Sequence, residues 1–184
     1  MPHAELCRLR LTWCLLLLPP QIDDQPNIYL NIDILEHEKS ESSSIGSKLT
    51  IEDDDFADLD EIIYRYVHPL IDHARSVVSF RKFVDKSKED ILAQMKEDQN
   101  NGGQTPYYLT VNRDPRFPGR FCLYYMRKTK HHMEDVKCTH KGFRYRNEYH
   151  SHPEKLTAYF KKNCELSSCL CPCRRLHSEH CHMI

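Results

Sequence analysis

The sequence predicts an α+β fold in which two small domains, each an antiparallel sheet flanked by helices, are joined by a long helix. Two observations predict it. Residues 27–35 alternate between apolar and other side chains, which is typical of a strand with one buried face. Residues 106–147 contain four short apolar segments separated by turn residues, between two stretches with helical spacing. Helices must cover the apolar face of each sheet, so both halves predict a layered arrangement.

The first half of the chain predicts two strands and one long helix. The alternating strand is followed by a charged, serine-rich loop and a short strand at 48–51. The acidic run at 52–55 is expected to begin a helix, because carboxylates stabilise the positive end of the helix dipole. Apolar residues at helical spacing extend this helix over residues 59–83, with a kink at Pro69. An opening helix and strand are missing, so this first domain should be incomplete.

The second half predicts a complete unit of helix, meander and helix. A capping-box pattern at 87–90 begins the first helix, and residues 100–103 break the chain after it. Strands are expected at 106–111, 120–126, 133–139 and 142–147. In the last of these, Arg144 and Arg146 should share one face, because side chains alternate along a strand. A final helix begins at His152.

Charge divides the chain into an acidic and a basic part. The formal net charge of the whole chain is −1, but it is −10 over residues 22–98 and +8 over residues 107–162. A basic half favours an anionic partner, which could be a phosphopeptide, an acidic tail or nucleic acid. The alternative is that the two oppositely charged halves attract one another.

The N-terminal segment 1–26 allows two interpretations. Arg8 and Arg10 precede an apolar run at 11–18, an outline that resembles a secretory signal peptide. The run has no small-x-small cleavage site and is too short to span a bilayer. The favoured interpretation is a partial strand at 8–14 followed by an insertion or an aberrant segment.

The C-terminal segment 164–184 is rich in cysteine and histidine. It offers soft zinc ligands, of which the candidates are Cys169, Cys171, Cys173 and His177. Their spacing is not the paired pattern of a zinc ribbon, and no apolar core would organise them. We therefore expect a disordered tail without a metal. The chain's cysteines cluster instead of forming an evenly spaced framework, which favours free thiols in a reducing compartment.

Several motifs resemble the tandem SH2 region of the suppressor-of-Ty-six family of transcription elongation factors, which are nuclear histone chaperones. The stretch 58–70 (DLDEIIYRYVHPL) is similar to the end of the family's first SH2 domain. Three motifs are similar to its second SH2 domain: PYY at 106–108, PGRF at 118–121 and KGFRYR at 141–146. The resemblance covers residues 27–163 and implies an SH2-type fold for both domains, with residues 27–83 in the first and 87–163 in the second.

The resemblance also identifies what is missing. In the family, the main phosphate pocket lies in the first SH2 domain and is built around an R-P-S-S segment. The residues before Leu11 contain no such segment, so we expect the first domain to lack this pocket. The second SH2 domain of the family has no buried phosphotyrosine arginine, and here the corresponding position falls near Val111 or Asn112.

Function follows as an expectation from the resemblance. The chain should be a non-enzymatic, nuclear module without cofactor or membrane contact, which binds the phosphorylated linker of the largest RNA polymerase II subunit. Binding should be shallow and use basic surface residues. The candidates are Arg113, Arg127, Lys128, Lys130, Lys137, Lys141, Arg144 and Arg146. The alternative is a basic module that binds nucleic acid or acidic partners without phosphate specificity.

Overall fold

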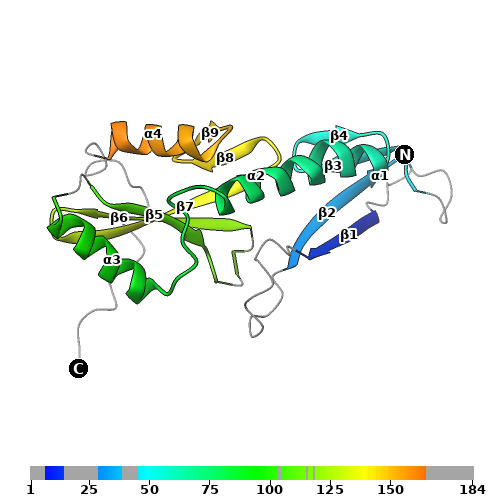
Figure 1. Cartoon of the computed structure of the whole chain (residues 1–184). Helices are drawn as coiled ribbons and strands as arrows, with labels where there is room; N and C mark the ends of the chain where they lie inside the picture. Colours follow the sequence, from blue (N-terminus) through cyan, green and yellow to red (C-terminus); the bar gives the residue numbers. More distant parts are fainter. Residues whose placement is uncertain are drawn as a thin grey trace, which may run out of the picture.

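The computed structural model describes residues 7–14, 29–38, 45–102, 105–114, 116–117 and 119–164. It contains two antiparallel sheets, as the α+β prediction requires (Figure 1). Of the N-terminal and C-terminal segments, only residues 7–14 and Cys164 are described. The insertion and the zinc ligands Cys169, Cys171, Cys173 and His177 therefore lie outside the described residues, as does the second half of the apolar run at 11–18.

The first sheet has the strand order β1-β2-β3-β4, with β1 (Cys7–Cys14), β2 (Tyr29–His37), β3 (Lys48–Ile51) and β4 (Asp54–Phe56). Ile32 and Ile34 of β2 are buried while Asp33 between them is exposed, which is the alternation that the sequence predicts. β1 occupies the stretch where a partial strand is expected, and it pairs with β2 from Cys7↔Glu36 to Cys14↔Tyr29.

The acidic run at 52–55 does not begin the helix, and that prediction is wrong. Glu52 and Asp53 form a turn, and Asp54 continues into β4. The helix is capped at Asp58, whose Oδ1 accepts a hydrogen bond of 2.7 Å from the Glu61 N–H. A side-chain acceptor at this position satisfies an N–H group that has no partner inside the helix.

One nearly continuous helix leads from the first sheet to the second. It consists of α1 (Leu59–Ile62), a π-helical turn η1 (Ile63–Val67) and α2 (His68–Val78). The irregular turn lies immediately before Pro69, which cannot donate a backbone hydrogen bond. The helix ends at Val78 and not near Phe83 as predicted. Phe83 instead forms a parallel bridge with Leu109, so this segment extends the edge of the second sheet.

The second sheet is a meander in the order β5-β6-β7-β8-β9. Its strands are β5 (Tyr107–Val111), β6 (Arg120–Arg127), β7 (Lys130–Thr139), β8 (Gly142–Tyr145) and β9 (Glu148–His150). Helix α3 (Lys88–Asn100) lies on one side, and α4 (Pro153–Asn163) lies on the other (Figure 1). β7 begins three residues before its predicted start, and the short strand β9 was not predicted.

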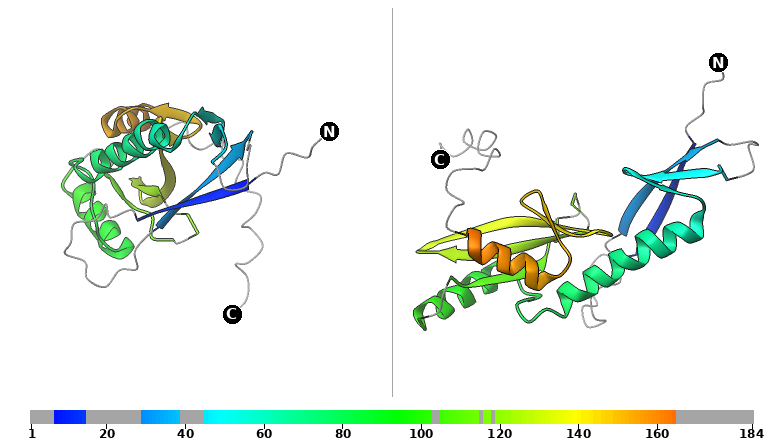
Figure 2. Two further views of the ribbon diagram at one scale, coloured as in Figure 1. Left: turned by 90° about the vertical axis from the view of Figure 1, so that its right-hand side faces the viewer. Right: turned by 90° about the horizontal axis from the view of Figure 1, so that it is seen from above.

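The two sheets share one hydrophobic core. Buried residues from β2, β3 and α2 form a single cluster with Phe143 and Tyr145 of β8 and Phe160 of α4. Helix α2 supplies the bridge, which Figure 2 shows running from one sheet to the other. Its His73 Nδ1 lies 3.0 Å from the carbonyl oxygen of Thr139, at the end of β7. A smaller cluster between α3 and the other face of the second sheet contains Met95, Tyr108 and Tyr124 among its members.

Candidate anion-binding surface

The eight basic residues expected from the sequence do not form one site. They divide into a pair at the contact between the sheets, a group at the β6–β7 turn, and single residues elsewhere. Lys137 and Lys141 belong to the pair, and Arg127, Lys128 and Lys130 to the turn. Arg113, Arg144 and Arg146 lie apart from both, and each has different surroundings.

Arg146 is a structural residue of the second sheet. Strand β8 ends at Tyr145, and Arg146 follows with a φ of 49°, so it does not share the face of Arg144 as predicted. Its Nε and Nη2 donate hydrogen bonds of 2.7 and 2.6 Å to the two carboxylate oxygens of Glu134. A paired, partly buried guanidinium of this kind is expensive to separate from its carboxylate. Arg146 is therefore a poor phosphate ligand.

The pKa of Glu134 reflects its hydrogen bonds to Arg146 and Tyr125. Burial alone would raise the pKa of Glu134, but hydrogen bonds from Arg146 and from the Tyr125 hydroxyl outweigh burial and lower it. The Tyr125 Oη donates to Glu134 Oε1 over 2.7 Å. The lowered pKa favours the charged form of the carboxylate. Its hydrogen bonds to Arg146 fix the turn that follows β8.

Lys137 and Lys141 connect the two sheets. Lys137 Nζ lies 3.0 Å from Glu52 Oε1, and Lys141 Nζ lies 2.7 Å from Asp54 Oδ2. His140 Nε2 also contacts Asp54 Oδ2, at 2.9 Å. The hydrogen bond from Lys141 is the main cause of the lowered pKa of Asp54. The expected attraction between oppositely charged halves is therefore present at this contact.

The β6–β7 turn presents cations to solvent. Lys128 and Lys130 are exposed and Arg127 is half-buried. Lys128 has a φ of 53°, and its carbonyl oxygen accepts a hydrogen bond from the Gln99 side chain of α3. Within the described part of the chain no carboxylate pairs with these three cations, so they can attract an anion but have no neighbouring donors to fix its position.

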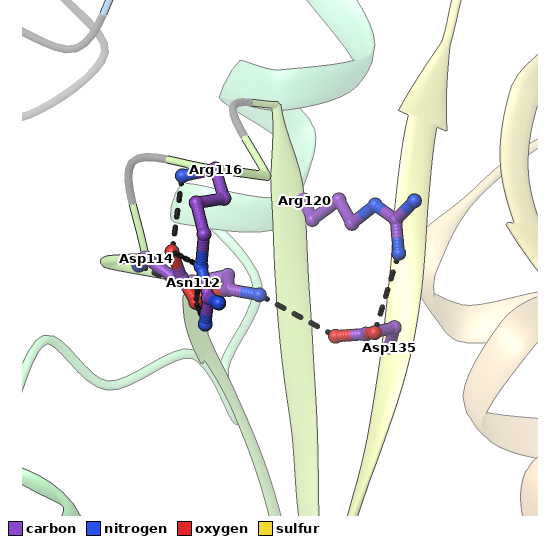
Figure 3. A network of polar contacts seen from close by, with 5 residues as sticks. All are labelled: Asn112, Asp114, Arg116, Arg120 and Asp135. Atoms are coloured by element: carbon purple, nitrogen blue, oxygen red, sulfur yellow. Dashed lines mark hydrogen bonds and ion pairs between the residues drawn. The ribbon is translucent and has the colours of Figure 1, made fainter. Parts of the chain in front are cut away.

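The loop between β5 and β6 is rich in arginine, but its charges are neutralised internally. Arg113 pairs with Asp85 at 2.6 Å, and Arg116 pairs with Asp114 at 2.6 Å. Figure 3 shows Arg120 reaching Asp135, with an Nη1–Oδ2 distance of 3.3 Å, while the Asn112 amide donates to the same carboxylate. Hydrogen bonds from Arg116 lower the pKa of Asp114 to about 2. A phosphomonoester would have to displace Asp85 or Asp114, each 2.6 Å from its arginine, to bind at Arg113 or Arg116.

A basic cleft at the edge of the second sheet is the better candidate, and the sequence did not reveal it. It has a volume of about 750 Å³ and lies where the segment after α2, the start of β5 and the end of α4 meet. The cations that line it are Arg81, Lys82 and Lys161. Asp98 is the one carboxylate among the described lining residues.

Aromatic rings position two of these cations. Lys82 Nζ lies 4.8 Å from the ring centroid of Tyr108, and Lys161 Nζ lies 5.4 Å from that of Tyr107. The backbone of Lys82 is fixed as well, because its carbonyl oxygen accepts a hydrogen bond of 2.9 Å from the Leu109 N–H. Cation–π contacts hold each ammonium group near a ring while leaving its hydrogens available to a ligand.

The remaining carboxylate is already engaged. Asp98 Oδ2 accepts a hydrogen bond of 2.6 Å from the Tyr108 hydroxyl. Burial, followed by this hydrogen bond, raises the pKa of Tyr108 to about 12. The cleft therefore carries three cations against one partly satisfied carboxylate. Lys82 and Lys161 are far apart in the sequence, which is why no local motif indicated the site.

The missing R-P-S-S pocket concerns residues 1–10, whose side chains are not described, so it stays a prediction. Within the described residues, no group of three or more His, Cys, Asp or Glu side chains is arranged to hold a metal ion. No described helix is both long and apolar enough to cross a bilayer.

The chain belongs to the SH2 domain family, whose family model matches residues 21–163. More particularly, its relatives are the SPT6 transcription elongation factors. It is 34% identical over 143 residues to the transcription elongation factor SPT6-like of Arabidopsis thaliana, and 30% identical over 145 residues to SPT6 of Drosophila melanogaster. Each alignment covers 74% of this chain but only 11% and 8% of the respective relative. The chain thus corresponds to a small part of those proteins.

Solved structures agree with the tandem arrangement. A tandem SH2 domain of the elongation factor Spt6, described as binding the phosphorylated RNA polymerase II C-terminal repeat domain, has a TM-score of 0.72 at 26% identity. That match covers 85% of this chain and 76% of the solved one. The tandem SH2 domains of Antonospora locustae Spt6 have the same fold, with a TM-score of 0.59 at 20% identity over 73% of this chain and 68% of that one. The predicted fold and family are confirmed.

Proposed function

We propose that this chain is a phosphoprotein-binding module that contacts the phosphorylated linker of the largest RNA polymerase II subunit, and that the basic cleft receives the phosphoryl group. Membership of the SH2 family supports a binding role, and the Spt6 neighbour binds a phosphorylated segment of the same polymerase. The module would act without catalysis, in the nucleus, where that polymerase works.

The charge of the cleft is the observation that carries this proposal. A phosphoserine or phosphothreonine side chain has a charge of about −1.5 to −2 at neutral pH and three strong acceptor oxygens. Lys82 and Lys161 both place an ammonium group over the Tyr107 ring, and Arg81 lines the same cleft. A guanidinium can bind two of those oxygens at once. Most of the other candidate cations are paired with a carboxylate, and the group at the β6–β7 turn lies on an exposed turn and not in a cleft.

The residues of β5 favour phosphoserine or phosphothreonine over phosphotyrosine. β5 carries no arginine, and its buried positions are occupied by residues such as Leu109 and Thr110. SH2 domains usually anchor phosphotyrosine with a buried arginine. The resemblance to the family's second SH2 domain implies that this arginine is missing here. Phosphoserine or phosphothreonine needs only surface donors, so these are the phosphorylated residues that we expect the cleft to bind.

Peptide titration tests the proposal. Fluorescence anisotropy should show that a labelled phosphorylated linker peptide binds the full chain at least tenfold more tightly than its unphosphorylated form. Lys82→Glu and Lys161→Glu should each remove most of that difference, since reversing a charge adds repulsion to a lost contact. Lys155→Glu is the matched control, because this exposed lysine is also on α4 but does not line the cleft.

Two results would contradict the proposal. One is equal affinity for the phosphorylated and unphosphorylated peptides. The other is a phosphate preference that survives both cleft substitutions, which would place the phosphoryl group elsewhere on the basic half.

A further inference from the structure

The α3 side of the second sheet is only partly covered. Helix α3 packs over β5 and β6, where Tyr108, Cys122 and Met126 are buried beneath it. Beyond β6 the same side is open, and residues that point from it are exposed, including Met133 and Lys137 of β7. This uncovered part of the sheet contains a regular arrangement of charge.

Three cations stand in line across three neighbouring strands. The strand register places Arg120 of β6 directly opposite Lys137 of β7, and Lys137 directly opposite Arg144 of β8. Directly opposed residues point to the same side of an antiparallel sheet, and neighbouring strands are about 4.8 Å apart. We call Arg120, Lys137 and Arg144 the cationic row. Like charges in direct opposition destabilise a sheet, so such a row has a cost that a ligand could offset.

Exposed aromatic rings lie at both ends of the cationic row. Tyr149 of β9 is directly opposite Arg144 in the register, and 54% of it is exposed. At the other end, Phe117 is 39% exposed, and the Arg120 guanidinium lies 4.7 Å from its ring centroid. The Arg116 guanidinium also contacts this ring, at 5.6 Å. Neither ring belongs to the buried clusters on the two faces of the sheet.

The internal partners of the row are weak. Arg120 pairs with Asp135 and Lys137 pairs with Glu52, and in both pairs each side chain is at least 36% exposed. Pairs with this exposure contribute little and exchange readily with solvent. Arg144 is exposed, and no carboxylate within the described ranges forms an ion pair with it. Each residue of the cationic row is therefore a single positive charge that is paired weakly.

We propose that the cationic row and its two flanking rings, Phe117 and Tyr149, form a binding surface for single-stranded nucleic acid. A phosphodiester backbone carries one negative charge per nucleotide, which suits spaced single cations better than a phosphomonoester dianion does. Bases that turn away from the backbone can stack on exposed aromatic rings without regard to sequence. The surface is separate from the cleft, which lies at the β5 edge, and its proposed ligand does not depend on the function proposed above.

The experiment uses the full chain and a short fluorescein-labelled oligouridylate, which has no stable secondary structure of its own. Anisotropy titrations at several salt concentrations should give a slope of log K against log salt of about −2, as expected for three phosphate contacts on a single strand. Arg144→Glu should reduce the affinity roughly tenfold and make the slope shallower. Tyr149→Ala should reduce it roughly five- to hundredfold, whereas Tyr149→Phe should keep near-native affinity because the ring remains.

Lys155→Glu is again the control, because it makes the same change of charge on the helix that covers the opposite side of the sheet. It should weaken binding by much less than Arg144→Glu does. The proposal is overturned if the oligouridylate does not bind, or if both glutamate variants weaken it equally. It is also overturned if Arg144→Glu and Tyr149→Ala weaken the phosphopeptide and not the oligouridylate, which would make this a peptide surface.

Discussion

The two sheets differ in how completely they are covered. The first has helix α1–η1–α2 against one face and depends on that helix, which also packs on the second sheet, for its core. The second sheet has α4 and α2 on one face and α3 on part of the other. The first sheet is thus stabilised by sharing its core with the second sheet. The binding surfaces that we propose lie on the second sheet, whose own helices hold them in place.

The largest effect on stability should come from removing an aromatic ring of the shared core where the second sheet meets helix α2. Phe143 is fully buried, and its ring lies 5.6 Å from that of His73 on α2. Phe143→Ala should lower the free energy of unfolding by about 3–5 kcal/mol. Trp13, the single tryptophan, lies in β1, so its fluorescence reports on the first sheet. If the shared core couples the sheets, denaturation followed by Trp13 should shift as much as denaturation followed by circular dichroism.

Ile34→Ala is the matched variant for that comparison, because Ile34 is a fully buried residue of the first sheet. In this variant too, the denaturation curve from Trp13 fluorescence and the curve from circular dichroism should shift by the same amount. A Trp13 transition that is unaffected by Phe143→Ala would show that the first sheet unfolds independently, and the idea of a shared core would fail.

The partly buried pair of Glu134 and Arg146 should have the next largest effect on stability. Glu134→Gln removes the carboxylate that accepts two hydrogen bonds from the Arg146 guanidinium, which is 22% exposed. We expect a loss of about 2 kcal/mol, less than for a fully buried pair. Urea denaturation measures it. Glu154→Gln, on the exposed first turn of α4, should change stability by a few tenths of a kcal/mol at most. Similar effects for both variants would mean that the Glu134–Arg146 pair has no structural importance.

The polar contact between the sheets should matter less. Asp54→Ala removes the carboxylate that contacts both His140 and Lys141. Because the carboxylate is only partly exposed and has two partners, we expect a loss of about 1 kcal/mol. Asp72→Ala is the control, since Asp72 and Arg75 form an exposed pair at 3.9 Å. Equal stabilities of the Asp54 and Asp72 variants would show that this contact does not hold the sheets together.

The smallest effect should appear as a dependence on pH. Burial lowers the pKa of His140 in spite of Asp54 nearby, so the unfolded chain binds a proton more readily than the folded one. His140 faces Asp54, Lys141, Glu52 and the ring of Tyr66. Stability should therefore be fully present above the ordinary histidine pKa of 6.5 and decrease as the pH falls through the folded pKa. His140→Gln should reduce this acid sensitivity, and an unchanged pH profile would exclude His140 as a source of it.

The sequence predicted the fold well where side-chain pattern determines structure. The alternation of β2 and the short strand at 48–51 were visible because apolar residues face one core. The strands β4 and β9 were missed because each has only three residues and depends on a neighbouring strand for its hydrogen bonds. The long helix ends early because residues 82–84 pair with β5, a tertiary contact that helical spacing cannot indicate.

The site was harder to predict than the fold. Net charge indicated the basic half correctly, but not which cations are free to bind. Only the predicted strand face of Arg146 was wrong, because β8 ends at Tyr145 and Arg146 follows with a positive φ and contacts Glu134. The cleft combines Lys82 and Lys161, whose proximity exists only after both packing and strand pairing are complete. The cationic row likewise depends on strand register, which the individual strand patterns do not specify.

Mapping the phosphopeptide on the folded chain tests the central claim most directly. Amide chemical-shift changes should be recorded while the phosphorylated linker peptide is added to the isotopically labelled full chain. We predict that the largest changes occur at Lys82, Tyr107 and Lys161, with little change in the loop at Asn112, Asp114 and Arg116. Changes centred on that loop, with none around Tyr107, would contradict the assignment of the cleft as the phosphate site.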